Sequence, residues 1–401
     1  MKKITVGWLE ISNDARNAIN RVLDSGHISE GVNVREFERK WAAYIGTKYC
    51  VAVSSGTAAL ITALNAVKSI YKLESRPEVI TTPLTYISDA NAIVLSGFRP
   101  VFVDIDTAKF CITPEVVEKY FKKNSGHLKS SIILPVDLMG YPVEMDKIKS
   151  IAKKYRLLTI EDAAEAHGSS YRDRKCGSTA DAGIFSFYIA HNIQAGEMGA
   201  ITTNNLKIYK LAKKFKSNGR VCDCSICTRN KGSCPGLNKI GADPRFLHDI
   251  IAYNFKTMEF PAAIALTQLP GIDQIIYRRK ENVKYLNKGL EDFQDILQLP
   301  LYQENVSYLA YPIVIKKPNI ISRSKLGFEL EKMGVETRPL FGCIPTQQPA
   351  FAYLKNKYRK SLPNAEYIGR NGFYVGCHQY LTKADLDCMI FALKNILKNK
   401  I

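Results

Sequence analysis

Residues 181–200, DAGIFSFYIAHNIQAGEMGA, hold the densest group of chemically informative side chains in the chain. They follow residues 157–160, an apolar run with the length and composition of a buried strand, which leads directly to Glu161 and Asp162. Similar apolar runs alternate along the chain with amphipathic segments at helical spacing, as at residues 13–25. Continuous apolar strands that alternate with helices predict an α/β fold, with a mainly parallel sheet covered on both faces.

A strand-to-helix turn near residue 56 predicts an anion-binding site. The apolar residues 51–53 are followed by residues 54–59, SSGTAA, which begin a helix. A glycine-containing turn of this type directs backbone N–H groups and the positive end of the helix toward a phosphate. Asp162 ends another predicted strand, and a buried carboxylate there needs a partner.

The length of 401 residues is sufficient for two domains around a substantial core, and 46% hydrophobic with 23% charged residues is typical of a globular enzyme. The formal net charge is +18, from 56 Lys and Arg against 38 Asp and Glu. The sequence contains no zinc-finger helix, RNA-binding signature or concentrated basic arm, so we do not expect a nucleic-acid partner. The excess positive charge instead suits phosphorylated small molecules and Lys-rich helix faces.

Membrane association is not expected from the sequence. No apolar run approaches the ~18 residues of a membrane-spanning helix. The first residues, MKKITVGWLEIS, include a basic pair but no sustained apolar core of the kind found in signal peptides. We therefore expect a cytoplasmic protein whose ten cysteines are reduced.

Four cysteines form a dense cluster with the spacing C-x-C-x2-C-x6-C: Cys222, Cys224, Cys227 and Cys234. In a reduced protein, thiolates at this spacing suit tetrahedral zinc or an iron–sulfur cluster. The spacing does not separate these two metals, and a loop of unmetallated cysteines is the third interpretation.

Together these motifs resemble the DegT/StrS-type nucleotide-sugar aminotransferases, a branch of the fold-type I pyridoxal-phosphate (PLP) enzymes, and the resemblance covers nearly the whole chain. It implies an aspartate-aminotransferase-like α/β fold. A large cofactor-binding domain with a seven-stranded, mainly parallel sheet is expected over residues 1–267, with a cysteine-rich insertion at 220–236. A smaller C-terminal α+β domain is expected over residues 268–401.

The resemblance fails at one decisive position. In the family, a Ser-Phe pair leads to a lysine that binds PLP as a Schiff base, whereas here Ser186 and Phe187 lead to His191. Imidazole cannot bond covalently to PLP in this way, but it can accept a proton near neutral pH. The subgroup with this replacement comprises 3-dehydratases of nucleotide-linked 4-keto-6-deoxyhexoses, which implies non-covalent pyridoxamine phosphate (PMP) and His191 as the base. Tyr188 is a second acid–base candidate, and Glu165 replaces the glutamine usual in the aminotransferases.

The resemblance also implies how the cofactor is bound. Tyr86, after the P-x-T of its loop, is expected to stack on the pyridine ring, and Asp162 to keep the ring nitrogen protonated. Asn254, in the motif Y-N-F-K, is expected to reach the phosphate of a neighbouring subunit, which would make the enzyme a homodimer with a shared active site. The implied cofactor-binding residues are Gly56, Thr57, Tyr86, Asp162, Glu165, Ser186 and Asn254.

Substrate contacts are less well defined by the sequence. Arg338, in a segment that matches the family's GxxTR element, is expected to meet the sugar or its diphosphate. His27 and Ser29 lie in a turn that is near the sugar nucleotide in relatives, although a solvent-exposed polar turn explains them equally well. His378 is either a residue lining the cleft or a packed histidine.

The expected function is that of an NDP-4-keto-6-deoxyhexose 3-dehydratase in deoxysugar biosynthesis for a surface polysaccharide, such as lipopolysaccharide, or a natural product. An iron–sulfur branch of these dehydratases has a C-x-C pair like that of Cys222 and Cys224 and takes electrons from a partner reductase. This chain departs from that branch at Ala164, where the branch has a further ligand. The alternatives are an aminotransferase with an atypical histidine, and a non-catalytic homologue whose zinc-bound loop mediates interactions.

Overall fold

A seven-stranded sheet forms the centre of the computed structural model, which describes residues 3–73, 77–124, 130–222, 224, 234 and 243–398. The strand order within these residues is β1-β9-β8-β5-β4-β2-β3. In that order the strands are Tyr49–Val53, Gly199–Thr203, Ala182–Ser186, Leu158–Asp162, Ser130–Leu134, Glu78–Thr81 and Arg99–Phe102. The five strands from β8 to β3 are mutually parallel, and β9 runs antiparallel to both β8 and β1. The prediction of a mainly parallel sheet is confirmed.

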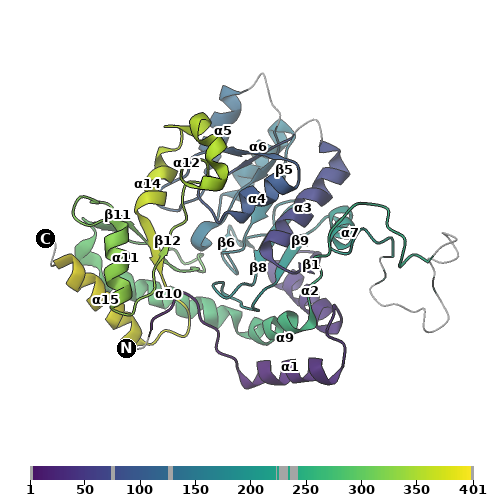
Figure 1. Ribbon diagram of the computed structural model, residues 1–401, viewed down its shortest axis with the longest axis horizontal. Helices are drawn as coiled ribbons and strands as arrows, with labels where there is room; N and C mark the ends of the chain where they lie inside the picture. The colour runs from purple at the N-terminus through teal and green to yellow at the C-terminus, as the bar shows by residue number, and fades with distance from the viewer. Residues whose placement is uncertain are drawn as a thin grey trace.

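Helices cover both faces of this sheet (Figure 1). Along β8 and β9, successive side chains point to opposite faces. Ile184 and Ile201 therefore belong to the core beneath α3, whereas Phe185 and Ala200 pack with Trp41 in the core beneath α2 and α9. The helices of this part are α1 (Asn13–Asp24), α2 (Val32–Ile45), α3 (Gly56–Tyr71), α4 (Ser88–Leu95), α5 (Pro114–Lys123), α6 (Met145–Tyr155), α7 (Leu206–Phe215) and α9 (Glu259–Gln268).

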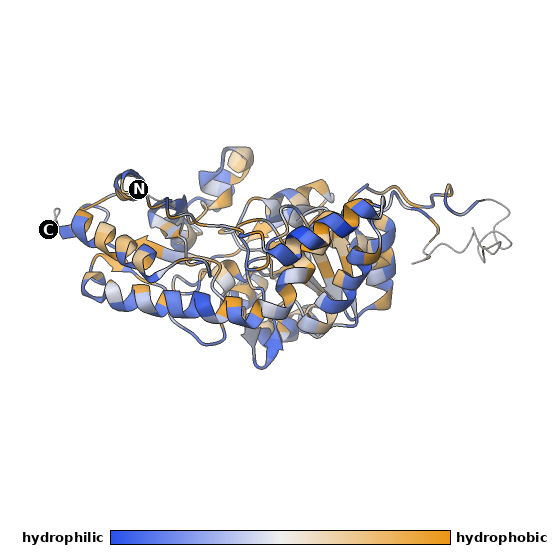
Figure 2. Ribbon diagram, turned by 90° about the horizontal axis from the view of Figure 1, so that it is seen from below, coloured by the Kyte–Doolittle hydropathy of each residue, from blue (hydrophilic) through white to orange (hydrophobic). Residues whose placement is uncertain are grey.

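Local sequence signals set the ends of several helices. Ser12, Ser55 and Thr113 lie at helix starts, where their hydroxyl groups accept hydrogen bonds from backbone N–H groups of the first turn. Peripheral helices carry hydrophilic and hydrophobic residues side by side (Figure 2), as amphipathic helices on a buried sheet do. No helix among the described residues combines the length and apolar character needed to cross a membrane.

A second, antiparallel sheet lies in the C-terminal part, with the order β10-β11-β13-β12. Its strands are, in that order, Leu297–Gln298, Tyr311–Ile315, Gly372–Val375 and Arg338–Pro339. The long helix α10 (Ile272–Gly289) follows α9, and α11 (Arg323–Lys332) and α15 (Lys383–Lys398) gather at the left of Figure 1. Shorter helices, α12 (Ile344–Gln347), α13 (Lys355–Tyr358) and α14 (Pro363–Asn371), connect these elements.

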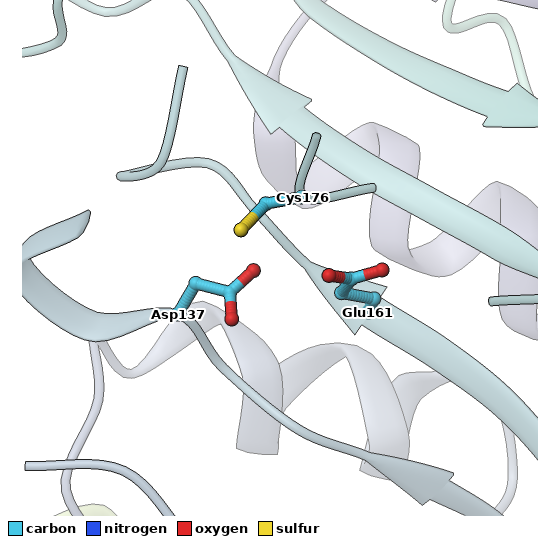
Figure 3. Close-up of side chains that lie close together, drawn as sticks. All are labelled: Asp137, Glu161 and Cys176. Atoms are coloured by element: carbon cyan, nitrogen blue, oxygen red, sulfur yellow. The ribbon is translucent and has the colours of Figure 1, made fainter. Parts of the chain in front are cut away.

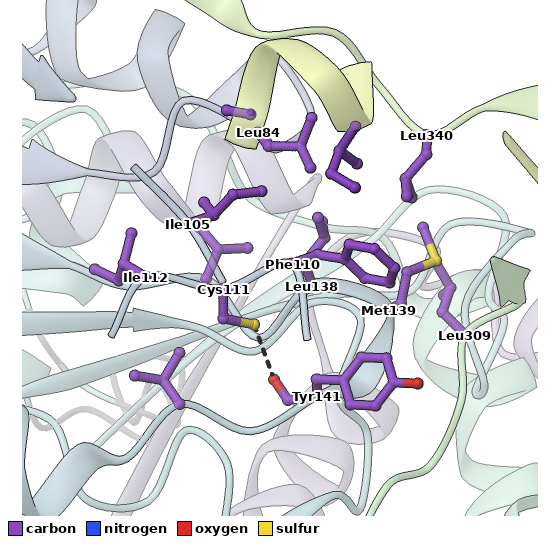
Figure 4. Packing of buried hydrophobic residues seen from close by; sticks show 14 of the residues in the cluster. Leu84, Ile105, Phe110, Cys111, Ile112, Leu138, Met139, Tyr141, Leu309 and Leu340 are labelled. Atoms are coloured by element: carbon purple, nitrogen blue, oxygen red, sulfur yellow. Dashed lines mark hydrogen bonds between the residues drawn. The ribbon is translucent and has the colours of Figure 1, made fainter. Parts of the chain in front are cut away.

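The two sheets share one hydrophobic core. Leu309 and Leu340, from the C-terminal part, pack near Phe110 and Met139 of the large sheet's loops (Figure 4). The N-terminus also pairs with the C-terminal part, because the backbone N–H of Ile4 donates to the carbonyl of Gly334 at 2.8 Å. The expected division after residue 267 falls at the end of α9, and it remains a prediction.

Candidate active site

The turn predicted to bind a phosphate lies where the N-terminus of α3 meets the end of β8. Gly56 begins α3, and a Cβ atom added there would lie 2.8 Å from the Cβ of Ser186. The hydroxyl of Ser55 accepts a hydrogen bond from Ala58 N at 3.1 Å, which fixes the turn. The structure therefore places Ser186 against the N-terminus of α3, where Gly56 and Thr57 begin the helix. Binding of a phosphate at this helix N-terminus stays a prediction.

Two buried carboxyl groups adjoin at the end of β5. Asp162 is its last residue, and its Oδ1 accepts a hydrogen bond from Ala164 N at 2.9 Å. Asp89 of α4 is fully buried, and its Oδ2 accepts from the Thr85 hydroxyl at 2.7 Å. Burial and the adjacent charge of Asp162 raise the pKa of Asp89 well above its usual range. Burial also raises the pKa of Asp162, whereas its interaction with Asp89 lowers it, so Asp89 is the carboxyl group of the pair that favours the proton.

A third acidic group, Glu165, lies in the loop that follows β5. Its Oε2 accepts a hydrogen bond from Met139 N at 2.7 Å. Burial raises the pKa of Glu165 to about 8, with a smaller contribution from the charge of Asp162. Glu165 is consequently neutral and able to donate a hydrogen bond near pH 7.

The geometry around His191 defines its protonation state. The turn brings His191 Nδ1 to 3.2 Å from the carbonyl oxygen of Tyr188. Because a carbonyl oxygen can only accept, Nδ1 carries the hydrogen and Nε2 is left as the basic nitrogen. Burial lowers the pKa of His191 to about 4, with a smaller opposing effect from the Tyr188 carbonyl and a further lowering by the charge of Arg279. The imidazole is therefore neutral at physiological pH.

Aromatic side chains surround this histidine. His167 is fully buried, and its ring stacks on that of His191 with 5.9 Å between centroids. The ring of Tyr188 lies 6.4 Å from His191 in an edge-on arrangement and is 41% exposed.

Tyr86 is 61% exposed and touches Phe341 edge-on at 6.1 Å, so most of its ring is open for stacking on a planar ligand.

The residues predicted to contact the substrate lie in three separate parts of the fold. Arg338 in β12 pairs with Glu336 at 3.1 Å. His27 and Ser29 are exposed in a turn that Glu259 fixes to α9, because the Glu259 carboxylate accepts from Gly31 N at 2.8 Å. His378 is buried, and its ring lies 6.0 Å from that of Tyr380. Its contact with the substrate stays a prediction.

A model of the DegT/DnrJ/EryC1/StrS aminotransferase family matches residues 9–394 of the sequence. The chain belongs to this family. It is 31% identical over 366 residues to the lipopolysaccharide biosynthesis protein RfbH of Salmonella typhimurium, an alignment that covers 88% of this chain and 82% of that protein. It is also 31% identical over 401 residues to the GDP-perosamine synthase of Caulobacter vibrioides, covering 99% of each.

Solved structures give the same assignment. The Escherichia coli GDP-4-keto-6-deoxy-D-mannose-3-dehydratase, determined with bound hydrated PLP, superposes with a TM-score of 0.85 at 25% identity, covering 98% of this chain and 100% of that one. This DegT-family protein thus has the PLP fold type I and is a PLP-dependent enzyme. Its own residues fit the cofactor, because the close approach of Gly56 and Ser186 leaves backbone N–H groups for a phosphate and Asp162 ends a strand beside it.

Asp89 is the site residue that sequence analysis missed. The sequence places Asp89 one helical turn after Thr85, at the start of a mostly apolar helix. An acidic residue in such a segment indicates a buried carboxyl group that needs a partner. His167 was also missed, although it follows Asp162 by only five residues in the sequence.

Asn254 lies beside the phosphate-binding turn, since the Ser54 N–H donates to the carbonyl of Phe255 at 2.9 Å. Its side chain is exposed and accepts a hydrogen bond from Lys256 Nζ at 2.6 Å. The expected contact of Asn254 with a neighbouring subunit stays a prediction.

The cysteine cluster is only partly covered by the structure. Cys222, Cys224 and Cys234 are among the described residues, whereas Cys227 lies outside them. The three described cysteines do not converge on one point as a metal site would require. The predicted zinc or iron–sulfur site therefore stays a prediction.

Proposed function

We propose that this enzyme is a PMP-dependent 3-dehydratase of a nucleoside-diphosphate-linked 4-keto-6-deoxyhexose. The observation that carries the proposal is His191, a neutral imidazole at the position where aminotransferases of the family have their Schiff-base lysine. The likeness to a solved GDP-4-keto-6-deoxy-D-mannose-3-dehydratase supports the same reaction. When bound, PMP supplies an amine for the C4 ketone and a ring that accepts negative charge.

In this proposal His191 is the base. Its Nδ1–H is engaged by the Tyr188 carbonyl, so Nε2 is the atom that takes a proton from the reacting carbon. The protonated imidazole can then deliver that proton to the hydroxyl group that leaves from C3. The phenol of Tyr188, exposed beside His191, is the second candidate for this donor.

The carboxyl groups divide two further tasks. Asp162 keeps a proton on the pyridine nitrogen. Asp89, in its protonated form, stabilises the negative charge of the Asp162 carboxylate. Glu165, neutral near pH 7, donates a hydrogen bond toward the ring's 3-oxygen. Arg338 meets the sugar or diphosphate, and His27 and Ser29 border the nucleotide.

Three further features belong to the proposal. Asn254 completes the site of a second subunit, which makes the enzyme a homodimer. The cluster Cys222, Cys224, Cys227 and Cys234 binds zinc or an iron–sulfur cluster. With an iron–sulfur cluster, electrons from a partner reductase would complete the deoxygenation; without one, hydrolysis would release a 3-deoxy-4-keto sugar, and an amino acid such as glutamate would regenerate PMP.

The second candidate is a sugar aminotransferase that uses histidine in place of lysine. The full-length similarity to a GDP-perosamine synthase favours it. The test is to incubate the PMP-loaded protein with GDP-, CDP- and dTDP-linked 4-keto-6-deoxyhexoses and to determine the product mass. Loss of the C3 hydroxyl group supports the dehydratase, whereas a 4-amino sugar from the wild-type protein overturns it.

A further inference from the structure

A second cluster of ionisable groups lies apart from the cofactor residues. It contains Asp137 from the loop after β4, Glu161 from β5 and Cys176 from the loop after β7 (Arg174–Lys175) (Figure 3). One possible ligand atom of each residue lies within 4.8 Å of the other two. All three side chains are buried, with at most 3% of each residue exposed.

The cluster and the cofactor site are on opposite faces of the sheet. Glu161 and Asp162 are neighbours in β5, and successive side chains of a strand point in opposite directions. Asp162 is directed toward Asp89, so Glu161 is directed away from the cofactor residues. The proposed chemistry therefore assigns no role to this cluster.

The backbone holds the three side chains in place. Asp137 N donates to the carbonyl of Asp162 at 2.9 Å, and Asp137 Oδ1 accepts from Val143 N at 2.8 Å. Cys176 N donates to the carbonyl of Ser169 at 2.9 Å. A site that binds an ion needs ligands fixed in this manner by the surrounding fold.

The charges of the cluster are not balanced by the protein. Asp137 Oδ2 and Glu161 Oε2 are both buried and have no hydrogen-bond partner in the described part of the chain. Burial raises the pKa of Glu161 to about 7 and that of Asp137 well above its usual range. Two acids in such contact require either shared protons or a cation between them.

A cleft of about 300 Å³ reaches Glu161 and Cys176 from the surface, and four basic residues line it: Lys149, Arg172, Arg174 and Lys175. Three of them have other partners. Lys149 Nζ donates to the carbonyl of Thr179 at 2.6 Å, Arg172 pairs with Asp146 at 2.6 Å, and Lys175 lies over the ring of Tyr44. The cleft gives an ion access to the cluster, and the charge of Lys149 is only the smallest of the effects on the pKa of Glu161.

We propose that Asp137, Glu161 and Cys176 bind a divalent cation of the zinc class, with a fourth coordination position open to the cleft. A thiolate with two carboxylates selects zinc or cobalt over magnesium and calcium, which prefer oxygen ligands alone. In a tetrahedral zinc site, bonds of about 2.3 Å to sulfur and 2.0–2.2 Å to oxygen hold the ligand atoms roughly 3.4–3.6 Å apart. The three ligand atoms here lie within 4.8 Å of one another, so small movements of the side chains bring them to bonding distance of one ion.

Charge balance permits this exchange. Without metal, one ligand group is ionised and the other two are protonated, which gives the cluster one negative charge. With a divalent ion all three groups are ionised, and the net charge is the same. The ion therefore replaces two protons without a change in buried charge. The bound ion would join the end of β4, the end of β5 and the loop after β7. It would therefore stabilise β5, the strand that ends in Asp162, from the face of the sheet opposite the cofactor residues.

Metal content of matched proteins tests the proposal. Wild-type protein, Cys176→Ala and Cys111→Ala are stripped with a chelator and titrated with Zn²⁺ against a chromophoric competitor, then with Co²⁺ to record the thiolate charge-transfer band. Cys111 is the control because it is an equally buried neighbour of the cluster whose thiol donates to the backbone carbonyls of Lys109 and Tyr141 (Figure 4). Metal held by the cysteine loop contributes equally to all three proteins and cancels in the difference.

We expect wild type and Cys111→Ala to bind one more equivalent of metal than Cys176→Ala. Equal binding by all three proteins overturns the proposal and leaves a cluster that shares protons. If Cys176→Ala does not fold, wild-type crystals soaked in Zn²⁺ decide the question. Anomalous density among Asp137, Glu161 and Cys176 supports the site, and its absence there excludes it.

Discussion

Gly56 and Ser186 approach so closely that a Cβ atom at position 56 would lie 2.8 Å from the Cβ of Ser186 and 3.2 Å from its hydroxyl oxygen. Since Gly56 begins α3, this contact joins the helix N-terminus to the strand that precedes His191. The two residues are far apart in sequence, and their contact lies at the helix N-terminus that we propose binds the cofactor phosphate.

Replacing Gly56 should therefore weaken cofactor binding. In Gly56→Ala the added methyl group displaces Ser186 or tilts the helix start, at a cost of about 1–3 kcal/mol, or roughly 5- to 150-fold in PLP affinity. Gly271→Ala is the matched control, because a Cβ atom there meets nothing within 4 Å. Fluorescence titration with PLP measures both proteins, and equal affinities would contradict the assigned phosphate site.

His191 variants separate chemistry from binding. His191→Asn keeps a polar side chain but removes the base, so kcat for dehydration should fall about 10²- to 10⁴-fold with little change in PMP affinity. His191→Lys should bind PLP covalently and shift its absorbance band. Tyr188→Phe, which keeps the ring and its contact with His191, should lose less activity than His191→Asn. An unchanged PLP spectrum in His191→Lys would show that residue 191 does not face the cofactor.

The pKa of His191 also determines where kcat/KM falls at low pH. Burial lowers this pKa to about 4, so the imidazole is already neutral, and thus basic, above about pH 5. The value of kcat/KM should rise with pH through about 4 and change little on account of His191 between pH 6 and 8. A limb near pH 6.5 that disappears in His191→Asn would show instead that the histidine is solvated in the free enzyme.

Much of this site was predictable because its residues are close in sequence or follow the ends of strands. The segment from Glu161 to His191 contains the proposed base and the proposed ring-binding acid. The amphipathic segment at residues 13–25 forms the helix Asn13–Asp24, because its apolar positions recur at helical spacing and Ser12 caps its start. Asp89 was missed because its burial depends on contact with a distant strand. The Asp137, Glu161 and Cys176 cluster was missed for the same reason, since three separate segments build it.

Asp89 offers a test of proton placement. If Asp89 is the proton donor to Asp162, Asp89→Asn retains a donor and should keep kcat within about threefold of wild type. Asp89→Leu removes the donor and the acceptor of the Thr85 hydroxyl, so kcat should fall by about tenfold or more, as expected for the loss of a hydrogen bond to a charged group. Steady-state kinetics at saturating cofactor measure both. Equal impairment of the two variants would indicate that Asp89 acts as a carboxylate.

Arg279 connects the active-site turn to the C-terminal part of the protein, because its guanidinium lies 3.5 Å from the carbonyl oxygen of His191. It is fully buried in α10, and its guanidinium donates to the carbonyl oxygens of Tyr308 and Leu309 at 3.2 and 2.7 Å. Arg279→Met fills similar space but leaves these carbonyl oxygens without their donor, so the free energy of unfolding should fall by about 2–5 kcal/mol. Arg39→Ala, which removes an exposed ion pair with Glu36, should lower it far less, because solvent screens that pair. Urea unfolding followed by circular dichroism compares the two. A loss for Arg279→Met as small as that for Arg39→Ala would mean that water replaces the guanidinium and that packing alone holds the two parts together.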